Sequence, residues 1–298
     1  MKQYLYILVA FSLAFGGCGS TDAPKKSEMS LEDLPEPTDG DTAIYENARA
    51  IFYSMPSPLE LTTLVKSAGG DFRKDLLHDP NRASIYQTSV KRALILGVYG
   101  ADLSYTTVYR QKNDAIKFLA ACKRVGEAIG IHEAFSAGLI ERANNNLENR
   151  DSMLAVLTDM YWHTNSQLRE ESRDQIAVLV MAGGWAEGLY IGTSMMTTTE
   201  LDKEITLRMS EQKYPAEQLS VMFGSFKGDQ MVDEAKPLFK AVFDFYAKLN
   251  TEEEALNVSA NKEGITTIGG KKDIEFGPEK IAELKKLAAE LRTKIIEQ

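Results

Sequence analysis

Apolar residues recur at helical spacing along most of the chain after residue 42. In the segment that begins at Asn81, apolar side chains recur at helical spacing, at Ile85, Val90, Leu94, Ile95, Val98 and Leu103. This period places them on one face of an α-helix. The same kind of pattern predicts further helices over residues 113–129, 132–147, 151–168, 176–196, 200–212, 216–223, 230–249 and 278–297. The expected fold is all-α, a multi-helix bundle with short loops.

Two motifs mark predicted helix starts. Ser57-Pro58-Leu59-Glu60 combines a capping serine, a proline at the first helical position and a glutamate that can reach back to the cap, which predicts a helix to about Ala68. Ser172-Arg173-Asp174-Gln175 has the spacing of a capping box and precedes the apolar segment 176–196.

One stretch departs from the helical pattern. Two β-prone runs, 265–268 and 274–276, flank the residues from Gly269-Gly270 to Asp273. They predict one short β-hairpin near 265–276 that turns at the glycine pair. A lone hairpin is marginally stable, so it would have to pack against the helices.

The segment 176–196 is almost wholly apolar, with Glu187 as its one charged residue. It is long enough to span a membrane, but a helix that is apolar on all sides is also typical of the centre of a large bundle. A carboxylate at bilayer depth is costly. The sequence therefore favours the central helix of a bundle over a membrane span.

Small residues form two stripes at four-residue spacing, Gly184, Gly188 and Gly192 in one helix and Ala93, Gly97 and Ala101 in another. Each mid-helix glycine costs about 1 kcal/mol relative to alanine, so something must offset that cost. A tight crossing of the two helices along these stripes is the favoured interpretation, and a ligand lying against the glycines is the alternative.

Three acidic residues on separate predicted helices lie among apolar or aromatic neighbours. Asp102 interrupts the run Gly97–Leu103, Glu187 follows Trp185, and Asp159 precedes a Tyr-Trp-His sequence. Buried carboxylates must be paired or hydrogen-bonded. One hypothesis is a ligand pocket with a polar floor and aromatic walls. Three unrelated hydrogen bonds, or exposed acids, are the alternative. The candidate lining residues are Tyr99, Asp102, Asp159, Trp185 and Glu187.

Few residues suggest catalysis or metal binding. The three histidines, His78, His132 and His163, form no His-x-x-x-His pair, and no glycine-rich phosphate loop follows a predicted strand. Asp159 and His163 are four residues apart and could meet on one helical face. An enzyme using this pair is the weakest of the functional alternatives, and we expect no catalytic residues, no metal ligands and no cofactor.

The charge balance argues against nucleic acid as a partner. The chain has 34 lysine and arginine residues against 43 aspartate and glutamate residues, a formal net charge of -9. Nucleic acids are bound through clustered basic side chains, whereas the basic residues here occur in short doublets among acids.

The N-terminus has the layout of a secretory signal. Lys2 is followed by an uncharged apolar stretch over 4–15 and then by Gly16-Gly17-Cys18. This stretch is shorter than the roughly 20 residues that span a bilayer, and it fits the apolar region of a signal peptide. Small residues followed directly by a cysteine resemble the lipobox of bacterial lipoproteins.

The resemblance implies cleavage before Cys18, which would then carry diacylglycerol on its sulfur and a fatty acyl chain such as palmitate on its amine. Residues 1–17 would be the signal peptide, and residues 18–41, rich in proline, glycine and charge, a flexible lipidated tether. Residues 42–298 would form a single helical domain. The remaining cysteine, Cys122, lies in an apolar helical stretch and is expected to be a buried core residue.

These observations predict a protein of the bacterial cell envelope, attached to a membrane through Cys18. We expect the outer membrane, on either its periplasmic or its surface face. The expected function is binding, of a small ligand or of another envelope protein. The alternative is a structural or adaptor lipoprotein without a ligand pocket.

Overall fold

The computed structural model describes residues 62–63, 66–67, 70–196, 201–249, 251–253, 257–260, 266–269, 272–274 and 276–297. The chain divides into two units, Met1–Thr42 and Ala43–Gln298, and all described residues belong to the second. The predicted signal peptide (1–17), the tether (18–41) with Cys18, and the predicted helix start at Ser57 lie outside the described residues.

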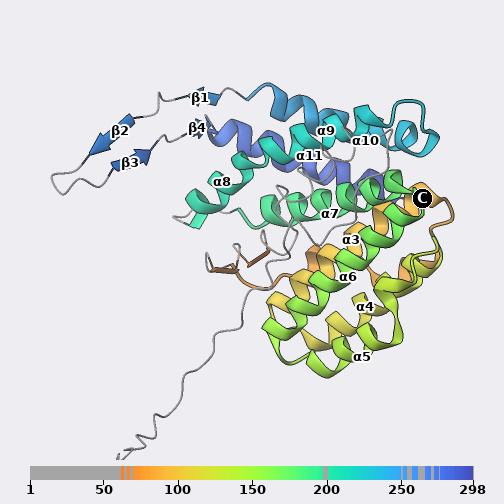
Figure 1. Cartoon of the computed structure of the whole chain (residues 1–298). Helices are drawn as coiled ribbons and strands as arrows, with labels where there is room; N and C mark the ends of the chain where they lie inside the picture. Colours follow the sequence, from red (N-terminus) through yellow and green to blue (C-terminus); the bar gives the residue numbers. More distant parts are fainter. Residues whose placement is uncertain are drawn as a thin grey trace, which may run out of the picture. The chain divides into compact units, whose positions relative to one another are not determined.

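The described residues form an all-α multi-helix bundle, which confirms the predicted fold class (Figure 1). Short 3-10 helices occur at η2 (Lys74–Leu76), η3 (Pro80–Ser84) and η4 (Glu133–Phe135). The α-helices are α3 (Ser89–Val108), α4 (Lys112–Glu127), α5 (Ala137–Asn146), α6 (Arg150–Glu170), α7 (Asp174–Ser194), α8 (Leu201–Glu211), α9 (Lys213–Ser225), α10 (Gln230–Ala247) and α11 (Pro278–Ile296).

Helix α7 lies at the centre of the bundle (Figure 1). Helix α7 packs against α3 and α6, which precede it in the chain, and against α8, α9, α10 and α11, which follow it. Helix α3 in turn packs on α4, so its buried face extends nearly all round the helix. The single free cysteine among the described residues, Cys122 on α4, is buried as predicted.

The most intimate contact is the crossing of α3 and α7. A Cβ atom at Gly97 would lie 2.0 Å from the carbonyl oxygen of Val180 and 2.5 Å from the backbone nitrogen of Gly184. A Cβ atom at Gly183 would lie 2.0 Å from the carbonyl oxygen of Leu94. Only glycine fits at such backbone contacts, because any side chain would overlap the opposite helix. The packing interpretation is therefore confirmed at this crossing.

The predicted glycine stripe does not run along a single neighbour. A Cβ atom at Gly192 would meet the side chain of Met209 on α8, at 2.8 Å, rather than α3. Successive glycines at four-residue spacing drift around the helix axis, so one end of the stripe faces α3 and the other faces α8.

Helix α7 is long and apolar enough to cross a membrane, and 89% of its most apolar window is buried inside the bundle. The other helices thus cover the surface that lipid would contact in a membrane span. This burial fits the predicted central helix.

Three predicted helix starts differ from the structure. The helix expected over 132–147 begins only at Ala137, because Glu133–Phe135 is the separate 3-10 helix η4. The helix expected from Asn81 begins only at Ser89, because Pro80–Ser84 is a 3-10 helix and the side chain of Thr88 caps α3 by accepting from Lys91 N. Ser172 does not cap α7: its φ is 55°, and Arg173 N donates to Leu168 O. This is the Schellman motif that ends α6, so the apparent capping box is a helix stop.

The strands near the C-terminus pair differently from the prediction. β3 (Thr266–Gly269) and β4 (Lys272–Ile274) fall in the expected region but do not pair with each other. β3 pairs antiparallel with β2 (Asn257–Ala260), and β4 with β1 (Thr251–Glu253). The chain therefore reverses between residues 260 and 266, and the hairpin turning at Gly269-Gly270 was a wrong prediction.

Candidate functional site

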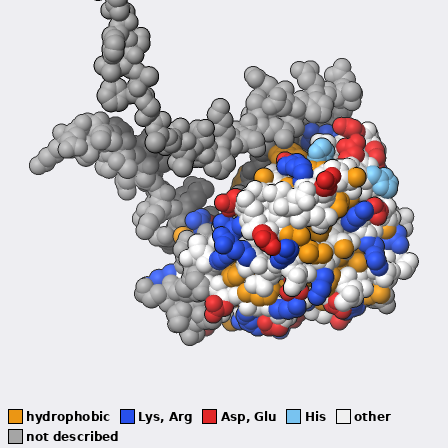
Figure 2. All heavy atoms as spheres, turned by 90° about the horizontal axis from the view of Figure 1, so that it is seen from below, with side chains coloured by type: hydrophobic (Ala, Val, Ile, Leu, Met, Phe, Trp, Pro, Cys, Tyr) orange, Lys and Arg blue, Asp and Glu red, His pale blue; other side chains and the backbone are white. Residues whose placement is uncertain are grey.

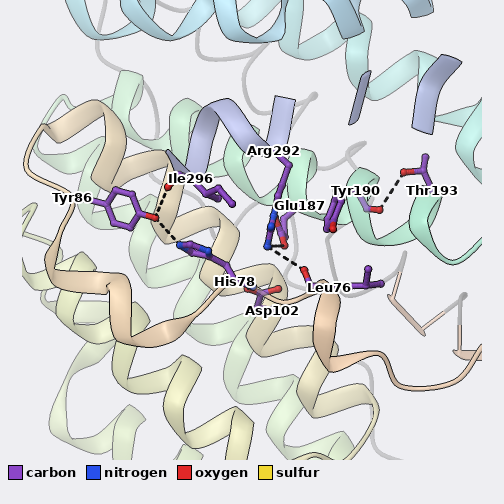
Figure 3. Close-up of polar contacts among 9 residues, drawn as sticks. All are labelled: Leu76, His78, Tyr86, Asp102, Glu187, Tyr190, Thr193, Arg292 and Ile296. Carbon is purple, nitrogen blue, oxygen red and sulfur yellow. Dashed lines mark hydrogen bonds and ion pairs between the residues drawn. The ribbon is translucent and has the colours of Figure 1, made fainter. Parts of the chain in front are cut away.

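Three charged side chains from three helices meet inside the bundle (Figure 3). Glu187 on α7 and Asp102 on α3 are both 0% exposed. Arg292 on α11 donates from Nε to Glu187 Oε2 at 3.1 Å and from Nη2 to Glu187 Oε1 at 3.3 Å. A guanidinium that binds both oxygens of a carboxylate is the strong form of an ion pair, and here the carboxylate is fully buried. We call Asp102, Glu187 and Arg292 the buried trio.

Each helix places its member of the buried trio for a recognisable reason. Asp102 and Glu187 lie on helices that are buried nearly all round and that cross at the glycines. Arg292 follows directly after Leu291, which belongs to the buried stripe of α11. Its guanidinium lies 4.7 Å from the centre of the Tyr190 ring, a cation–π contact on the side away from Asp102 (Figure 3).

Asp102 is only partly satisfied by hydrogen bonds. Its Oδ2 accepts from the backbone N–H of His78 at 3.1 Å, whereas its Oδ1 receives no hydrogen bond from a donor among the described residues. The group that the Asp102 carboxyl meets is Glu187. Two acidic side chains are thus placed together with a single cation, Arg292, which is paired with Glu187.

Burial changes the acidity of both carboxyl groups. Burial raises the pKa of Asp102 well above its usual range, and the negative charge of Glu187 raises it further. Burial also raises the pKa of Glu187, although Arg292 opposes this by charge and hydrogen bonding. Burial alone would lower the pKa of Arg292, but the two acids more than offset that effect, so its pKa is raised.

The segment over residues 73–78 crosses the buried trio, and we call it the strap. Arg292 Nη2 donates to the carbonyl oxygen of Leu76 at 3.1 Å, and His78 N–H donates to Asp102. At the start of the strap, the backbone N–H of Arg73 donates to the hydroxyl of Tyr105 at 2.9 Å. The strap is therefore fixed to α3 and α11 through groups that lie inside the bundle.

A second polar chain extends the site to the end of α11. His78 Nε2 lies 2.6 Å from the Tyr86 hydroxyl, which donates to the carbonyl oxygen of Ile296 at 3.0 Å (Figure 3). Burial lowers the pKa of His78 to about 4, with Arg292 and Arg82 acting in the same direction. His78 is therefore neutral near pH 7, with a hydrogen on Nε2 if Tyr86 donates onward to Ile296.

The structure brings together some of the predicted pocket residues and separates others. Asp102 and Glu187 meet as expected. Tyr99 lies beside them, because its ring stacks on His78 at 5.3 Å between centroids and its hydroxyl donates to Asp79 O. Trp185 points elsewhere on α7, where its Nε1 donates to Gln212 at 3.1 Å.

Asp159 is not part of this cluster. It forms an ion pair with Arg142 at 2.8 Å, and its side chain is 42% exposed. His163 on the same helix is exposed. Within the described ranges, no group of three histidine, cysteine, aspartate or glutamate side chains is arranged to hold a metal ion.

Sequence reasoning missed Arg292, His78 and Tyr86. Arg292 carries a signal that could have revealed it, because it stands beside the apolar face of the amphipathic helix 278–297. His78 and Tyr86 lie in a loop without regular periodicity, so no pattern marks them.

The carboxyl groups of Asp102 and Glu187 are fully buried, and all their polar atoms except Asp102 Oδ1 have hydrogen-bond partners inside the bundle. No family model matches the chain, and searches of the curated proteins and of the solved structures found no match either.

Proposed function

We propose that this chain is a lipid-anchored protein of the bacterial cell envelope whose helical domain binds another envelope protein and performs no chemistry of its own. The proposed anchor is Cys18, with the tether 18–41 between the lipid and the domain. Acyl chains contribute about 0.8 kcal/mol per buried methylene, so several of them on one residue hold a protein stably on a membrane.

The observation that carries the binding proposal is a row of exposed apolar side chains on α8 and α9. Leu207, Tyr214 and Val221 are 45%, 50% and 55% exposed, and they follow one another at seven-residue intervals. Together with Ile116 on α4, they are the exposed large hydrophobic residues of the described chain. We call Leu207, Tyr214 and Val221 the apolar row.

Tyr214 and Val221 lie on one side of α9, and Leu207 lies on α8, with Gln212 between the two helices. Gln212, between α8 and α9, has helical φ and ψ of -64° and -6°, and Ala216 N donates to Gln212 O at 2.9 Å. Residues seven apart on a helix are offset by only about 20° around its axis. Trp185 further fixes this junction through its hydrogen bond to Gln212.

The chemistry of the apolar row favours an amphipathic helix as its partner. Apolar residues at heptad spacing are the seam along which a second helix packs. Ion pairs of Arg208 with Glu211 at 2.9 Å and of Lys213 with Glu217 at 2.7 Å lie along the same two helices, as charges do at the rim of an interface. On the face in Figure 2, basic and acidic side chains are interspersed, with hydrophobic side chains visible between them.

The small-ligand version of the proposal has less support. Asp102 and Glu187 were its best candidates, yet both are fully buried and engaged with Arg292, with each other or with His78. A ligand would have to displace the strap to reach them.

Photo-crosslinking in living cells tests the partner proposal. A photoreactive residue replaces Tyr214 in the full chain, and the matched control carries it at Ile116, which is 40% exposed. We expect one discrete protein adduct from position 214, none from 116, and loss of the adduct when Leu207→Ser and Val221→Ser are added.

Equal labelling at both positions, or an adduct that survives the two serine substitutions, would contradict the proposal. An adduct of twice the mass of the chain would also contradict it, because the partner would then be a second copy. A purely structural lipoprotein, the alternative, predicts no adduct at either position.

A further inference from the structure

We propose that Asp102 and Glu187 form a buried binding site for one proton, which bridges the two carboxyl groups and leaves a single negative charge to pair with Arg292. The site joins α3, α7 and α11 and lies beneath the strap (Figure 3).

The hydrogen-bond inventory requires a proton. Glu187 accepts both guanidinium N–H groups through its two oxygens, and Asp102 Oδ2 accepts from His78 N–H. The remaining oxygen, Asp102 Oδ1, is buried and has no donor among the described residues. An ionised carboxylate can only accept, so the hydrogen bond between the two acids exists only when one of them carries a hydrogen.

The charge balance requires it as well. With both acids ionised, the buried trio would carry two negative charges against one positive charge, and an uncompensated charge inside a protein is strongly disfavoured. With one proton bound, the buried trio is neutral overall.

The surrounding titratable groups supply no second cation in direct contact with Asp102. Tyr99 and Tyr105 on α3 and Cys122 on α4 are uncharged near neutral pH, and so is His78. Arg82 on η3 is directed to Ile296 O, at 3.5 Å.

Loss of the proton has a definite structural consequence. Two anions would then compete for the one guanidinium that also holds Leu76 O, and repulsion would act between α3 and α7 at their crossing. The strap and α11 are the elements released first, because each is tied to the bundle through these groups.

The test is the pH dependence of unfolding of the purified full chain. The folded state holds a proton that the unfolded chain has lost, so the unfolding constant rises by as much as tenfold per pH unit. His78 acts in the opposite direction between about pH 4 and pH 6.5, so the measurement is made above pH 6.5.

Asp102→Asn is the decisive variant, because an amide donates to Glu187 and accepts from His78 as the protonated acid does. We expect this variant to lose the rise of the unfolding constant above pH 6.5, the ordinary pKa of a histidine side chain. Asp159→Asn is the matched control: it makes the same change in an exposed ion pair and should leave the rise unaltered. Equal pH dependence in Asp102→Asn and in the unmutated chain would overturn the proposal.

Infrared spectroscopy gives a readout that does not depend on any variant folding. Asp102 and Glu187 are the fully buried acidic side chains among the described residues. At neutral pH the unmutated protein should show the C=O stretch of a protonated carboxylic acid, and this band should shift when aspartate or glutamate is labelled with carbon-13 at its side-chain carboxyl. Absence of the band would overturn the proposal.

Discussion

The side chain of Arg292 interacts with more residues than that of either other member of the buried trio. It holds both oxygens of Glu187, donates to Leu76 O in the strap, and lies over the Tyr190 ring. Its own side chain is 13% exposed. Removal of such a residue leaves a buried carboxylate without its cation, which is far more costly than the loss of a surface ion pair.

Replacement of Arg292 by methionine should therefore lower the free energy of unfolding by about 3–5 kcal/mol near neutral pH. The loss should shrink as the pH falls, because Glu187 can then take up a proton and become neutral. Denaturant unfolding of the full chain measures both effects. Arg142→Met, which breaks the exposed pair with Asp159, is the control and should cost no more than about 1 kcal/mol. Similar losses in the two variants would contradict this assignment.

His78 predicts a loss of stability in acid. Its folded-state pKa is lowered from 6.5 to about 4, so the unfolded chain binds more protons between those values. Stability contributed by the neutral ring is present above pH 6.5 and is lost as the pH falls toward 4, by up to about 3 kcal/mol. His78→Gln should remove this pH dependence, as measured by denaturant unfolding at a series of pH values. An unchanged acid profile in His78→Gln would contradict it.

Single residues show where sequence reasoning about the site succeeds. Asp102 and Glu187 were identifiable because charges inside apolar runs imply burial. The sequence could not show which partners they find, because Arg292 is 105 residues away from Glu187 and comes from a different helix. Asp159 and Trp185 were grouped with Asp102 and Glu187 because they also have aromatic neighbours in the sequence. The packing of the helices places both of them away from that pair.

At the scale of elements, the crossing of α3 and α7 depends on backbone contact. Gly97 and Gly183 each face a carbonyl oxygen of the other helix, at a distance that no Cβ atom tolerates. Gly100, one turn from Gly97 on α3, has no atom within 4 Å of its would-be Cβ position. On α3, therefore, position 97 accepts only glycine, whereas position 100 has room for a side chain.

Gly97→Ala should destabilise the protein by about 3 kcal/mol or more. The added methyl group would overlap the backbone of α7, and that backbone can shift only if the whole helix moves. Gly100→Ala should instead stabilise it by about 0.5–1 kcal/mol, since it reduces the freedom of the unfolded chain at a helical position with free space. Thermal and denaturant unfolding of the two variants provide the comparison. A mild effect of Gly97→Ala would mean that the helices do not cross as closely as described.

Most helices were predictable within a few residues from periodicity alone, because their buried faces are long. The failures lie where the backbone departs from a simple helix. The chain from Asn81 to Thr88 was assigned to α3, although a 3-10 helix precedes the cap. The strands β3 and β4 were predicted near the right residues but with each other as partners. Strand pairing depends on where the chain reverses, and Gly269-Gly270 has the sequence of a turn although these two strands do not pair across it.

At the scale of the whole molecule, the proposed lipid anchor and the helical domain have separate roles. The tether after Cys18, residues 19–41, could extend to about 75 Å if fully stretched. The composition and the signal sequence predict the compartment, but nothing in a single sequence names the partner. The proposed binding surface is the apolar row, and the periodicity of the sequence predicted only the helices that carry it.

Cys18→Ala should release the protein from the membrane into the aqueous fraction, because the proposed acyl chains would be absent. Mass spectrometry of the N-terminal peptide of the unmutated protein should find Cys18 as the first residue, with its acyl groups. An intact Met1 or an unmodified cysteine would contradict the anchor. The domain's unfolding curve should be the same in both proteins, which separates anchoring from folding.

The contacts of Arg292 also set an order of events during synthesis. They join residues separated by 105 and 216 positions, so the centre of the bundle cannot be completed until α11 has left the ribosome. Long-range contacts of this kind slow folding, because the chain must close large loops before they contribute. A nascent chain whose core stays incomplete until α11 is made remains unfolded enough to pass through a narrow channel. Under the proposed export through a narrow channel, late completion of the core would keep the chain competent for translocation, and the domain would fold after it has crossed the membrane.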